Sequence, residues 1–184
     1  SGFIVTSNNQ ATGLLPRIAD VQETITPIEG SWNVYFDPRW GGPGKVVFDE
    51  LIDWTVHADT GIRYYSGTVV YHKELNLAMP AQNERLLLRF PRLGSLARVW
   101  VNGKEVVTVW CSPWEADITS YVHEGKNNLK IEVVNSLMNR MIGDASLPES
   151  ERFTYAYPQI ATPTDKLVPS GIMEQLNLVY RQCQ

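Results

Sequence analysis

Short runs of alternating apolar and polar residues follow one another along most of the chain. Leu129, Ile131 and Val133 alternate with Lys130 and Glu132, for example. A period of two residues is typical of a β-strand that has one face in the core and one face in water. The pattern predicts strands at residues 31–36, 45–48, 67–77, 85–90, 96–102, 105–110, 128–135 and 173–180.

Turn signals separate these runs. The segment Val101-Asn102-Gly103-Lys104 lies between two of them, and Asn-Gly supplies the two positive φ angles that a type I′ hairpin turn requires. No convincing stripe with a period of 3.6 residues occurs after residue 27. The sequence therefore predicts an all-β sandwich rather than an alternating α/β fold.

Two segments depart from the strand pattern. Residues 1–27 lack sustained periodicity and end at Pro27, so they are interpreted as a linker or the tail of a preceding domain, and residues 28–184 as the domain itself. Residues 136–170 contain no strong strand pattern. Irregular segments of this length in a compact domain usually have a function.

Composition narrows the classes of partner. The chain has 184 residues and a net charge of −4, and it contains no basic run of the kind that binds a phosphate backbone, so nucleic acid is not expected. Its apolar runs are too short to cross a bilayer. Because it begins Ser1-Gly2 without Met, we expect a processed or excised piece of a longer protein.

Metal and cofactor chemistry find little support. Cys111 and Cys183 are the only cysteines and are interpreted as free thiols, since they lack the spacing of zinc ligands. No EF-hand loop is present. We expect no cofactor, although a structural calcium ion held by loop carbonyls and carboxylates is compatible with the sequence.

Catalysis by this chain alone is not expected. A glycosidase needs two carboxylates about 5–10 Å apart in a cleft, but acidic residues in loops are mostly solvated. The acidic candidates are Asp49, Glu50, Asp53, Asp59, Asp144, Glu149 and Glu151. The three histidines, His57, His72 and His123, are scattered, and no Gly-x-Ser-x-Gly motif is present.

Aromatic residues are frequent near turns. Aromatics at loop edges offer flat apolar faces to a ligand, whereas aromatics within strands usually belong to the core. The candidate stacking residues, which lie close to Gly, Pro or Asp, are Trp40, Trp54, Tyr64, Tyr65 and Trp114. For Trp40 the alternative is packing against the rim of the sandwich.

Three polar residues stand together inside the long irregular segment. Asn139, Arg140 and Asp144 combine an amide, a guanidinium and a carboxylate around Gly143. Such donors and acceptors suit a polyhydroxylated ligand. Alternatively, Arg140 and Asp144 form an ion pair that fixes the loop.

Several segments together resemble known sugar-processing proteins. The chain over residues 28–180 resembles the C-terminal β-sandwich of bacterial α-L-rhamnosidase-type glycoside hydrolases of family 106 and, more distantly, the sugar-binding domain of family 2 glycosidases. The segments that carry the resemblance are GSWNVYFDPRWGGPGKVVFDELIDWT, GIRYYSGTVVYHKEL, VWVNGKEVVTVW, NNLKIEVVNSLMNRMIGDASLPESERFTY and LVPSGIMEQLNLVY. The resemblance implies a jelly-roll β-sandwich like that of galactose-binding domains.

The resemblance also implies an ancillary role. Catalytic carboxylates of these families lie in a separate barrel domain, so none is assigned here. In family 2 relatives the long loop, here residues 135–170, reaches toward the active site of the barrel, which favours Asn139, Arg140 and Asp144 as contacts. The segment 110–114 departs from the family pattern. A periplasmic or extracellular parent protein is a further implication.

The sequence leads to two functional hypotheses. In the first, the chain is a non-catalytic carbohydrate-binding-like domain of a glycoside hydrolase, which binds or positions sugar beside a catalytic domain. In the second, it is a scaffold between domains and has no affinity for glycans. Loop aromatics fit both hypotheses, because a flat apolar face packs equally well on sugar and on protein.

Overall fold

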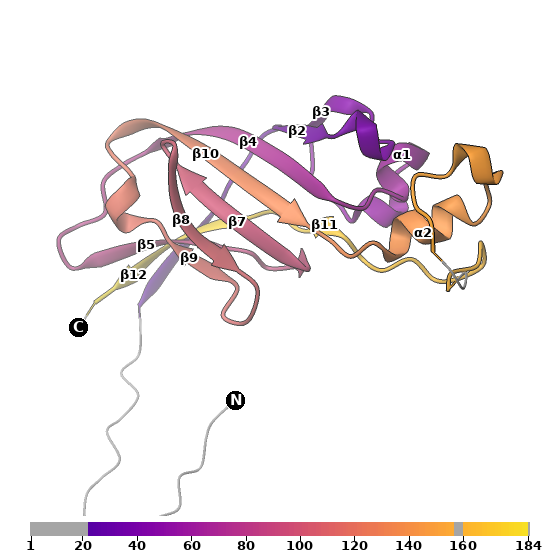
Figure 1. Cartoon of the computed structure of the whole chain (residues 1–184). Coiled ribbons are helices and arrows are strands. Elements are labelled where there is room, and N and C mark those ends of the chain that lie inside the picture. Colours follow the sequence, from indigo (N-terminus) through magenta and orange to yellow (C-terminus); the bar gives the residue numbers. More distant parts are fainter. Residues whose placement is uncertain (1–21, 157–159, 184) are drawn as a thin grey trace, which may run out of the picture.

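Two antiparallel sheets pack face to face in the computed structural model, which describes residues 22–156 and 160–183 (Figure 1). The six-stranded sheet has the order β3 (Gly44–Phe48), β2 (Trp32–Phe36), β4 (Thr68–Leu77), β10 (Gly125–Val134), β7 (Leu96–Val101) and β8 (Lys104–Val109). The four-stranded sheet has the order β1 (Glu23–Pro27), β12 (Asn177–Gln182), β5 (Glu84–Arg89) and β9 (Glu115–Asp117). A small pair joins β11 (Gly171–Ile172) to β6 (Leu93–Gly94).

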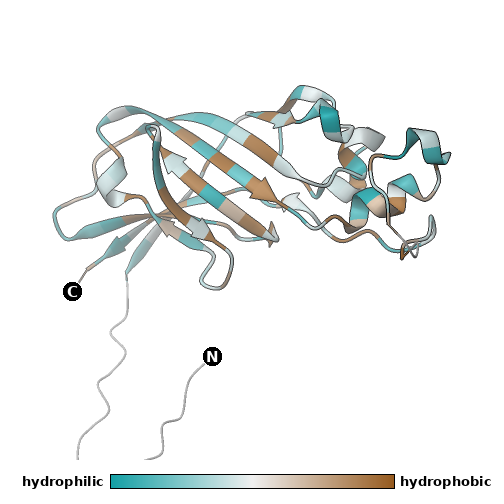
Figure 2. Cartoon of the chain, in the orientation of Figure 1, coloured by the Kyte–Doolittle hydropathy of each residue, from teal (hydrophilic) through white to brown (hydrophobic). Residues whose placement is uncertain are grey.

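The core lies between the two sheets. Leu129, Ile131 and Val133 of β10 are buried, whereas Lys130 and Glu132 alternate with them on the outer face. Figure 2 shows this alternation of hydrophobic and hydrophilic residues along the strands of the six-stranded sheet. The predicted all-β jelly-roll sandwich is confirmed.

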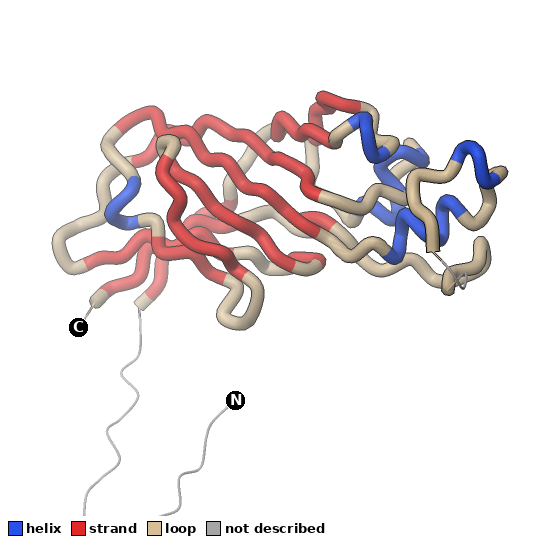
Figure 3. Tube along the Cα trace, in the orientation of Figure 1, coloured by secondary structure: helices blue, strands red, loops and turns tan. Residues whose placement is uncertain are grey.

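Most of the short helices gather at one end of the sandwich (Figure 3). They are η1 (Pro38–Trp40), η2 (Trp54–Val56), α1 (Thr60–Arg63), α2 (Met138–Asp144) and η4 (Glu149–Glu151). We call these elements, with the segments that connect them, the helical end. A further 3-10 helix, η3 (Thr119–Tyr121), lies at the opposite end.

The predicted strands and the hairpin turn agree largely with the structure. Asn102 and Gly103 have φ angles of 52° and 78°, as a type I′ turn requires. The strand predicted at residues 173–180 is wrong in its start, because β12 begins at Asn177 and Gly171–Ile172 form a separate strand. The short strands β1, β6, β9 and β11 were not predicted.

The domain boundary predicted at Ile28 is too late. Strand β1 pairs with β12 along its whole length, so the sandwich includes residues from Glu23 onward. Residues 1–21, the rest of the predicted tail, lie outside the described residues.

A ring of four charged side chains links β1, an edge strand of the four-stranded sheet, to the other three strands. Arg181 Nε lies 2.7 Å from Glu23 Oε1 and Arg181 Nη2 lies 2.9 Å from Glu115 Oε2. Arg89 Nη2 completes the ring, at 2.8 Å from Glu23 Oε2 and 2.6 Å from Glu115 Oε1. The hydrogen bond from Arg89 is the largest effect that lowers the pKa of Glu23; burial opposes it, and the hydrogen bond from Arg181 lowers the pKa further.

Both cysteines are free and exposed, so the prediction of free thiols is confirmed. Among the residues that the structure describes, no helix is long and apolar enough to cross a membrane.

Candidate functional site

Three aspartates begin the short helices of the helical end. The Asp37 carboxylate accepts a hydrogen bond from Arg39 N, and the Asp53 carboxylate accepts one from Thr55 N. The Asp59 carboxylate likewise accepts one from Gly61 N. Each satisfies a backbone N–H group that a helix start leaves unpaired. These acidic residues therefore have local structural roles.

Trp54 joins the helical end to the core. Its side chain is fully buried, and its Nε1–H donates a hydrogen bond of 2.7 Å to Tyr71 Oη. Burial raises the pKa of Tyr71, so its hydroxyl stays protonated. Gly171 passes close to the indole with a φ of 93°, and a Cβ atom at this position would overlap the ring. The sequence Ser-Gly-Ile thus allows the close approach of β11 to Trp54.

Tyr65 is also a core residue. Its ring packs edge to face against Phe36 and Trp54. The Tyr65 hydroxyl accepts a hydrogen bond from Asp37 N and donates one to Thr68 O. Because Trp54 and Tyr65 are completely buried, they present no face to a ligand in this structure.

Asn139 holds helix α2 against the segment that precedes β11. Its Nδ2 donates hydrogen bonds to Val168 O and Ser170 Oγ, at 2.7 and 3.1 Å, and its Oδ1 accepts one from Val168 N at 2.8 Å. Ser170 N in turn donates to Asp53 Oδ1. The amide of Asn139 is therefore used within the chain.

Arg140 and Asp144 form a buried ion pair along one turn of α2. Arg140 Nε lies 3.1 Å from Asp144 Oδ1, and the two side chains are only 6% and 3% exposed. The pair is a close ionic contact without hydrogen-bond alignment, because neither atom has a hydrogen-bond partner among the described residues. Asp144 Oδ2 accepts hydrogen bonds from Phe153 N, Thr154 N and Thr154 Oγ1.

The three residues predicted to contact a sugar, Asn139, Arg140 and Asp144, thus stabilise the segment in which they lie. Arg140 N donates to Ser66 Oγ, and the Arg140 guanidinium lies 5.0 Å from the centre of the Phe153 ring. Of the alternatives drawn from the sequence, the loop-fixing ion pair is present. Contact of Asn139, Arg140 or Asp144 with a sugar would require their surroundings to open.

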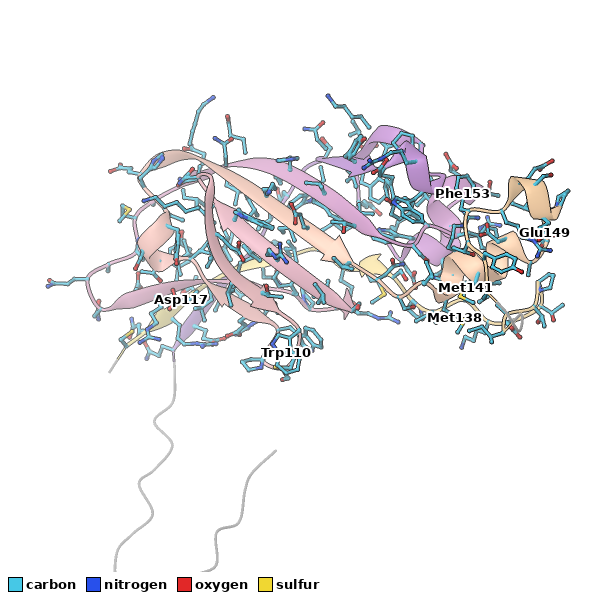
Figure 4. The ribbon with its side chains drawn as sticks, in the orientation of Figure 1. Trp110, Asp117, Met138, Met141, Glu149 and Phe153 are labelled. Atoms are coloured by element: carbon cyan, nitrogen blue, oxygen red, sulfur yellow. The ribbon has the colours of Figure 1, made fainter. Side chains whose placement is uncertain are left out.

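Exposed aromatic rings remain at the helical end. Trp40 is 45% exposed, Phe153 42% and Tyr155 78%. The Phe153 ring packs against the backbone at Gly41, the residue after Trp40, since a Cβ atom at Gly41 would lie 3.0 Å from that ring. Figure 4 shows Phe153 beside the helices, with Met141 and Glu149 at the same end. Phe153 and Tyr155 were not predicted as stacking residues, although both are aromatics within the long segment 136–170.

The remaining aromatic candidates lie in two places. Tyr64 is half-buried against Gly143 of α2, so it belongs to the helical end. Trp114 is half-buried against the sandwich core in the loop between β8 and β9. Figure 4 shows Trp110, which begins that loop, well away from Phe153. The structure therefore brings together Trp40, Tyr64, Asn139, Arg140 and Asp144, but not Trp114.

The helical end contains a small cavity. Within residues 22–156 and 160–183, no group of three or more His, Cys, Asp or Glu side chains is placed to hold a metal ion. A cavity of about 40 Å³ lies beside Asp144, Thr154 and Tyr155, which is room for little more than a water molecule.

The chain belongs to a family of sugar-binding domains. Residues 18–181 match the family "Glycosyl hydrolases family 2, sugar binding domain". The resemblance expected from the sequence is confirmed, and the chain is a domain of glycoside hydrolase family proteins.

Particular relatives agree with this assignment. The chain is 38% identical over 123 residues to a protein of Formosa agariphila named "Putative beta-glucuronidase", covering 66% of the chain and 11% of that protein. It superposes on a rhamnosidase from Novosphingobium sp. PP1Y with a TM-score of 0.82 and 28% identity, covering 95% of the chain and 16% of that structure. A Ruminococcus gnavus β-glucuronidase shares the fold, with a TM-score of 0.61 and 22% identity over 86% of the chain and 28% of that structure. The chain thus spans between about a tenth and a quarter of the length of these relatives.

Proposed function

We propose that the chain is a non-catalytic domain of a glycoside hydrolase and that its helical end positions sugar beside a catalytic domain. The family match over residues 18–181 is the observation that carries this proposal. The chain covers only 11% of the Formosa agariphila protein and 16% of the rhamnosidase, so both relatives are long enough to contain other domains. A catalytic domain and a carbohydrate are accordingly the proposed partners.

The geometry of the helical end supports this role. Trp40 and Phe153 both offer exposed aromatic area at the helical end, and aromatic faces stack on the apolar faces of sugar rings. The ion pair of Arg140 and Asp144 holds Phe153, since the guanidinium lies 5.0 Å from the centre of its ring and Asp144 Oδ2 accepts a hydrogen bond from Phe153 N. A surface that is fixed before the ligand arrives loses less conformational entropy on binding.

A scaffold between domains is the second candidate function. It is favoured by exposed aliphatic and aromatic side chains at or near the helical end, namely Val56, Leu137, Tyr155, Ile160 and Val168. Such side chains bury well against another protein domain. In this case the chain would have no affinity for glycans by itself.

Calorimetric titration distinguishes the two candidates. The purified chain is titrated with L-rhamnose- and D-glucuronate-containing oligosaccharides, with and without calcium, and the titration is repeated with Trp40→Ala and Phe153→Ala. Arg140→Ala is unsuitable as a test because it would break a buried ion pair.

Saturable binding whose affinity falls about tenfold in both variants supports sugar positioning by the helical end. A tenfold loss of affinity corresponds to about 1.4 kcal/mol of binding free energy. The control is Trp110→Ala, which removes a more exposed ring far from the helical end. Absence of heat from folded protein supports the scaffold. A calcium requirement and residence outside the cytoplasm belong to the same proposal and are tested by the calcium arm and by locating the parent protein in cells.

A further inference from the structure

The outer face of the six-stranded sheet carries two neighbouring hollows. One, of about 490 Å³, is lined by residues that include Trp100, Lys130 and Asn128, and the other, of about 590 Å³, by residues that include Tyr35 and Val47. Asn33 and His72 line both hollows. The two hollows therefore adjoin one another at these two residues, and we call them together the sheet-face groove.

A single row of paired residues runs along this groove. Trp100 of β7 is paired with Lys130 of β10, Lys130 with His72 of β4, His72 with Asn33 of β2, and Asn33 with Val47 of β3. Residues that are paired directly across neighbouring strands point to the same face. With strands about 4.8 Å apart, the row from Trp100 to Asn33 covers about 14 Å. This length fits several sugar rings in a chain better than one.

The polar side chains of the groove are available to a ligand. The side chains of Asn33, His72 and Asn128 have no hydrogen-bond partner within the described parts of the chain, and all three are exposed. Amide and imidazole groups both donate and accept hydrogen bonds, as sugar hydroxyls do. Burial, and then the charge of Lys130, lower the pKa of His72, so the ring is neutral at pH 7.

Aromatic rings stand at both parts of the groove. Trp100 lies on the outer face with Lys130 Nζ 3.8 Å from its ring centre, and Tyr35 is 39% exposed on the same face. Outer faces of antiparallel sheets are usually polar where they meet water. Aromatic rings interleaved with amides and imidazole are instead typical of a surface that receives a polyhydroxylated ligand.

Two of the lysines at or beside the groove are in ion pairs. Lys130 Nζ lies 3.0 Å from Glu132, and Lys126 Nζ lies 3.0 Å from Glu74. Lys45 and Lys73 also line the groove, so its lining has a small excess of positive charge. The hydrogen-bonding side chains, rather than the charges, therefore favour a neutral ligand rich in hydroxyl groups.

We infer that the sheet-face groove binds a neutral oligosaccharide laid across the strands from Trp100 toward Tyr35, with Asn33, His72 and Asn128 as its hydrogen-bonding side chains. This site is separate from the helical end and does not depend on sugar binding there. The family to which the chain belongs and the hydrogen-bonding groups favour a glycan over a protein at this face.

The test uses three neutral hexasaccharides, cellohexaose, xylohexaose and mannohexaose, with the matching disaccharides. Binding to the whole chain is followed by calorimetry and by amide chemical-shift changes in NMR. We expect at least one hexasaccharide to bind, its disaccharide to bind more weakly, and the shifted amides to lie on β2, β4, β7 and β10. Trp100→Ala should weaken binding about tenfold, or about 1.4 kcal/mol.

Asn33→Ala is the second variant, because truncation of an exposed polar side chain leaves the fold intact. Trp110→Ala is the matched control that removes an exposed indole elsewhere, and we expect it to keep affinity within about twofold. Circular dichroism and urea unfolding check that every variant is folded.

Three results would overturn the inference. The first is that none of the hexasaccharides binds the folded chain. The second is that binding is lost in Trp40→Ala and retained in both Trp100→Ala and Asn33→Ala, which places the sugar at the helical end. The third is self-association that Val47→Glu abolishes in sedimentation, which makes the groove a contact between copies. Binding of the rhamnose or glucuronate probes alone, sensitive to Trp40→Ala, would leave the proposed function standing without this site.

Discussion

Asn139 at the helical end and Asn33 on the sheet face have the same side chain and opposite surroundings. Asn139 is 1% exposed and makes hydrogen bonds to Val168 and Ser170. Asn33 is exposed on β2, and its amide has no partner among the residues that the structure describes. The first amide stabilises a loop, whereas the second is open to solvent.

The difference teaches that a polar residue in a long loop is a weak indicator of a ligand site. A segment such as 136–170 lacks the regular hydrogen bonds of a sheet, so its buried backbone groups need side-chain partners. Asn139 and Asp144 supply them. On a regular strand the hydrogen bonds to the neighbouring strands already pair the backbone groups. The side chains there are not needed as backbone partners and remain available to a ligand.

The largest expected effect is loss of the buried ion pair. Asp144→Ala removes the partner of Arg140 and the acceptor for Phe153 N and Thr154 N. We expect the free energy of unfolding to fall by about 3–5 kcal/mol, because an uncompensated buried charge remains. Urea unfolding measures it. The double variant Arg140→Met/Asp144→Ala should recover part of the loss, and a change below about 1 kcal/mol in the single variant would contradict the buried pair.

The next largest loss of stability is expected at Gly171, and Gly103 is its comparison because both glycines have a positive φ. Gly171→Ala places a Cβ atom into the Trp54 indole, whereas a Cβ atom at Gly103 would meet nothing within 4 Å. We expect a loss of about 2–4 kcal/mol at Gly171, from strain and overlap together, and about 1 kcal/mol at Gly103, from the left-handed backbone alone. Thermal and urea unfolding measure both. Equal losses would show that Trp54 does not pack closely against β11.

A smaller effect comes from the two asparagines themselves. Asn139→Ala leaves Val168 N without its partner and Val168 O with Ser170 Oγ as its donor, so we expect a loss of about 1–3 kcal/mol. Asn33→Ala should change the free energy of unfolding by less than about 0.5 kcal/mol. Urea unfolding of both proteins in one buffer makes the comparison, and a cost at Asn33 as large as that at Asn139 would remove the contrast between the two regions.

The smallest effect concerns pH. The groups that face His72 are Lys130 and Glu132 from β10, Asn33 from β2 and, along its own strand, Glu74. Because its folded pKa is lowered, the unfolded state binds more protons below pH 6.5, and stability falls as the pH decreases through this region. An NMR titration of the His72 ring measures the pKa directly. In His72→Gln the part of the pH dependence that belongs to this group should disappear.

The sandwich could be predicted from the sequence because its long strands alternate strictly. In β10 every second residue, such as Leu129 and Ile131, is buried. Strand β1 could not, since all five of its residues are exposed at the edge of a sheet and it ends in Pro27. Helix α2 has no apolar stripe, because Asn139, Arg140 and Asp144 occupy its buried face.

The sequence predicted where the candidate site lies, but not which of its aromatic side chains are exposed. The long segment 136–170 does form the helical end, and Trp40 is exposed there. Trp54 and Tyr65 have the same turn-like neighbours in sequence as Trp40, but they lie in the core. Which aromatic of a loop turns inward depends on distant partners such as Tyr71 and Gly171, and local sequence does not contain that information.

The pairing of β1 with β12 also decides how the domain would respond to tension. Glu23 at the start of β1 stands opposite Arg181 near the end of β12, so a force that pulls the two ends of the chain apart loads one residue pair after another, as in a zipper. The ring formed with Arg89 and Glu115 is the first obstacle to that peeling. In single-molecule pulling we expect β1 to detach at low force before the sandwich opens, and Glu23→Gln to lower that first force.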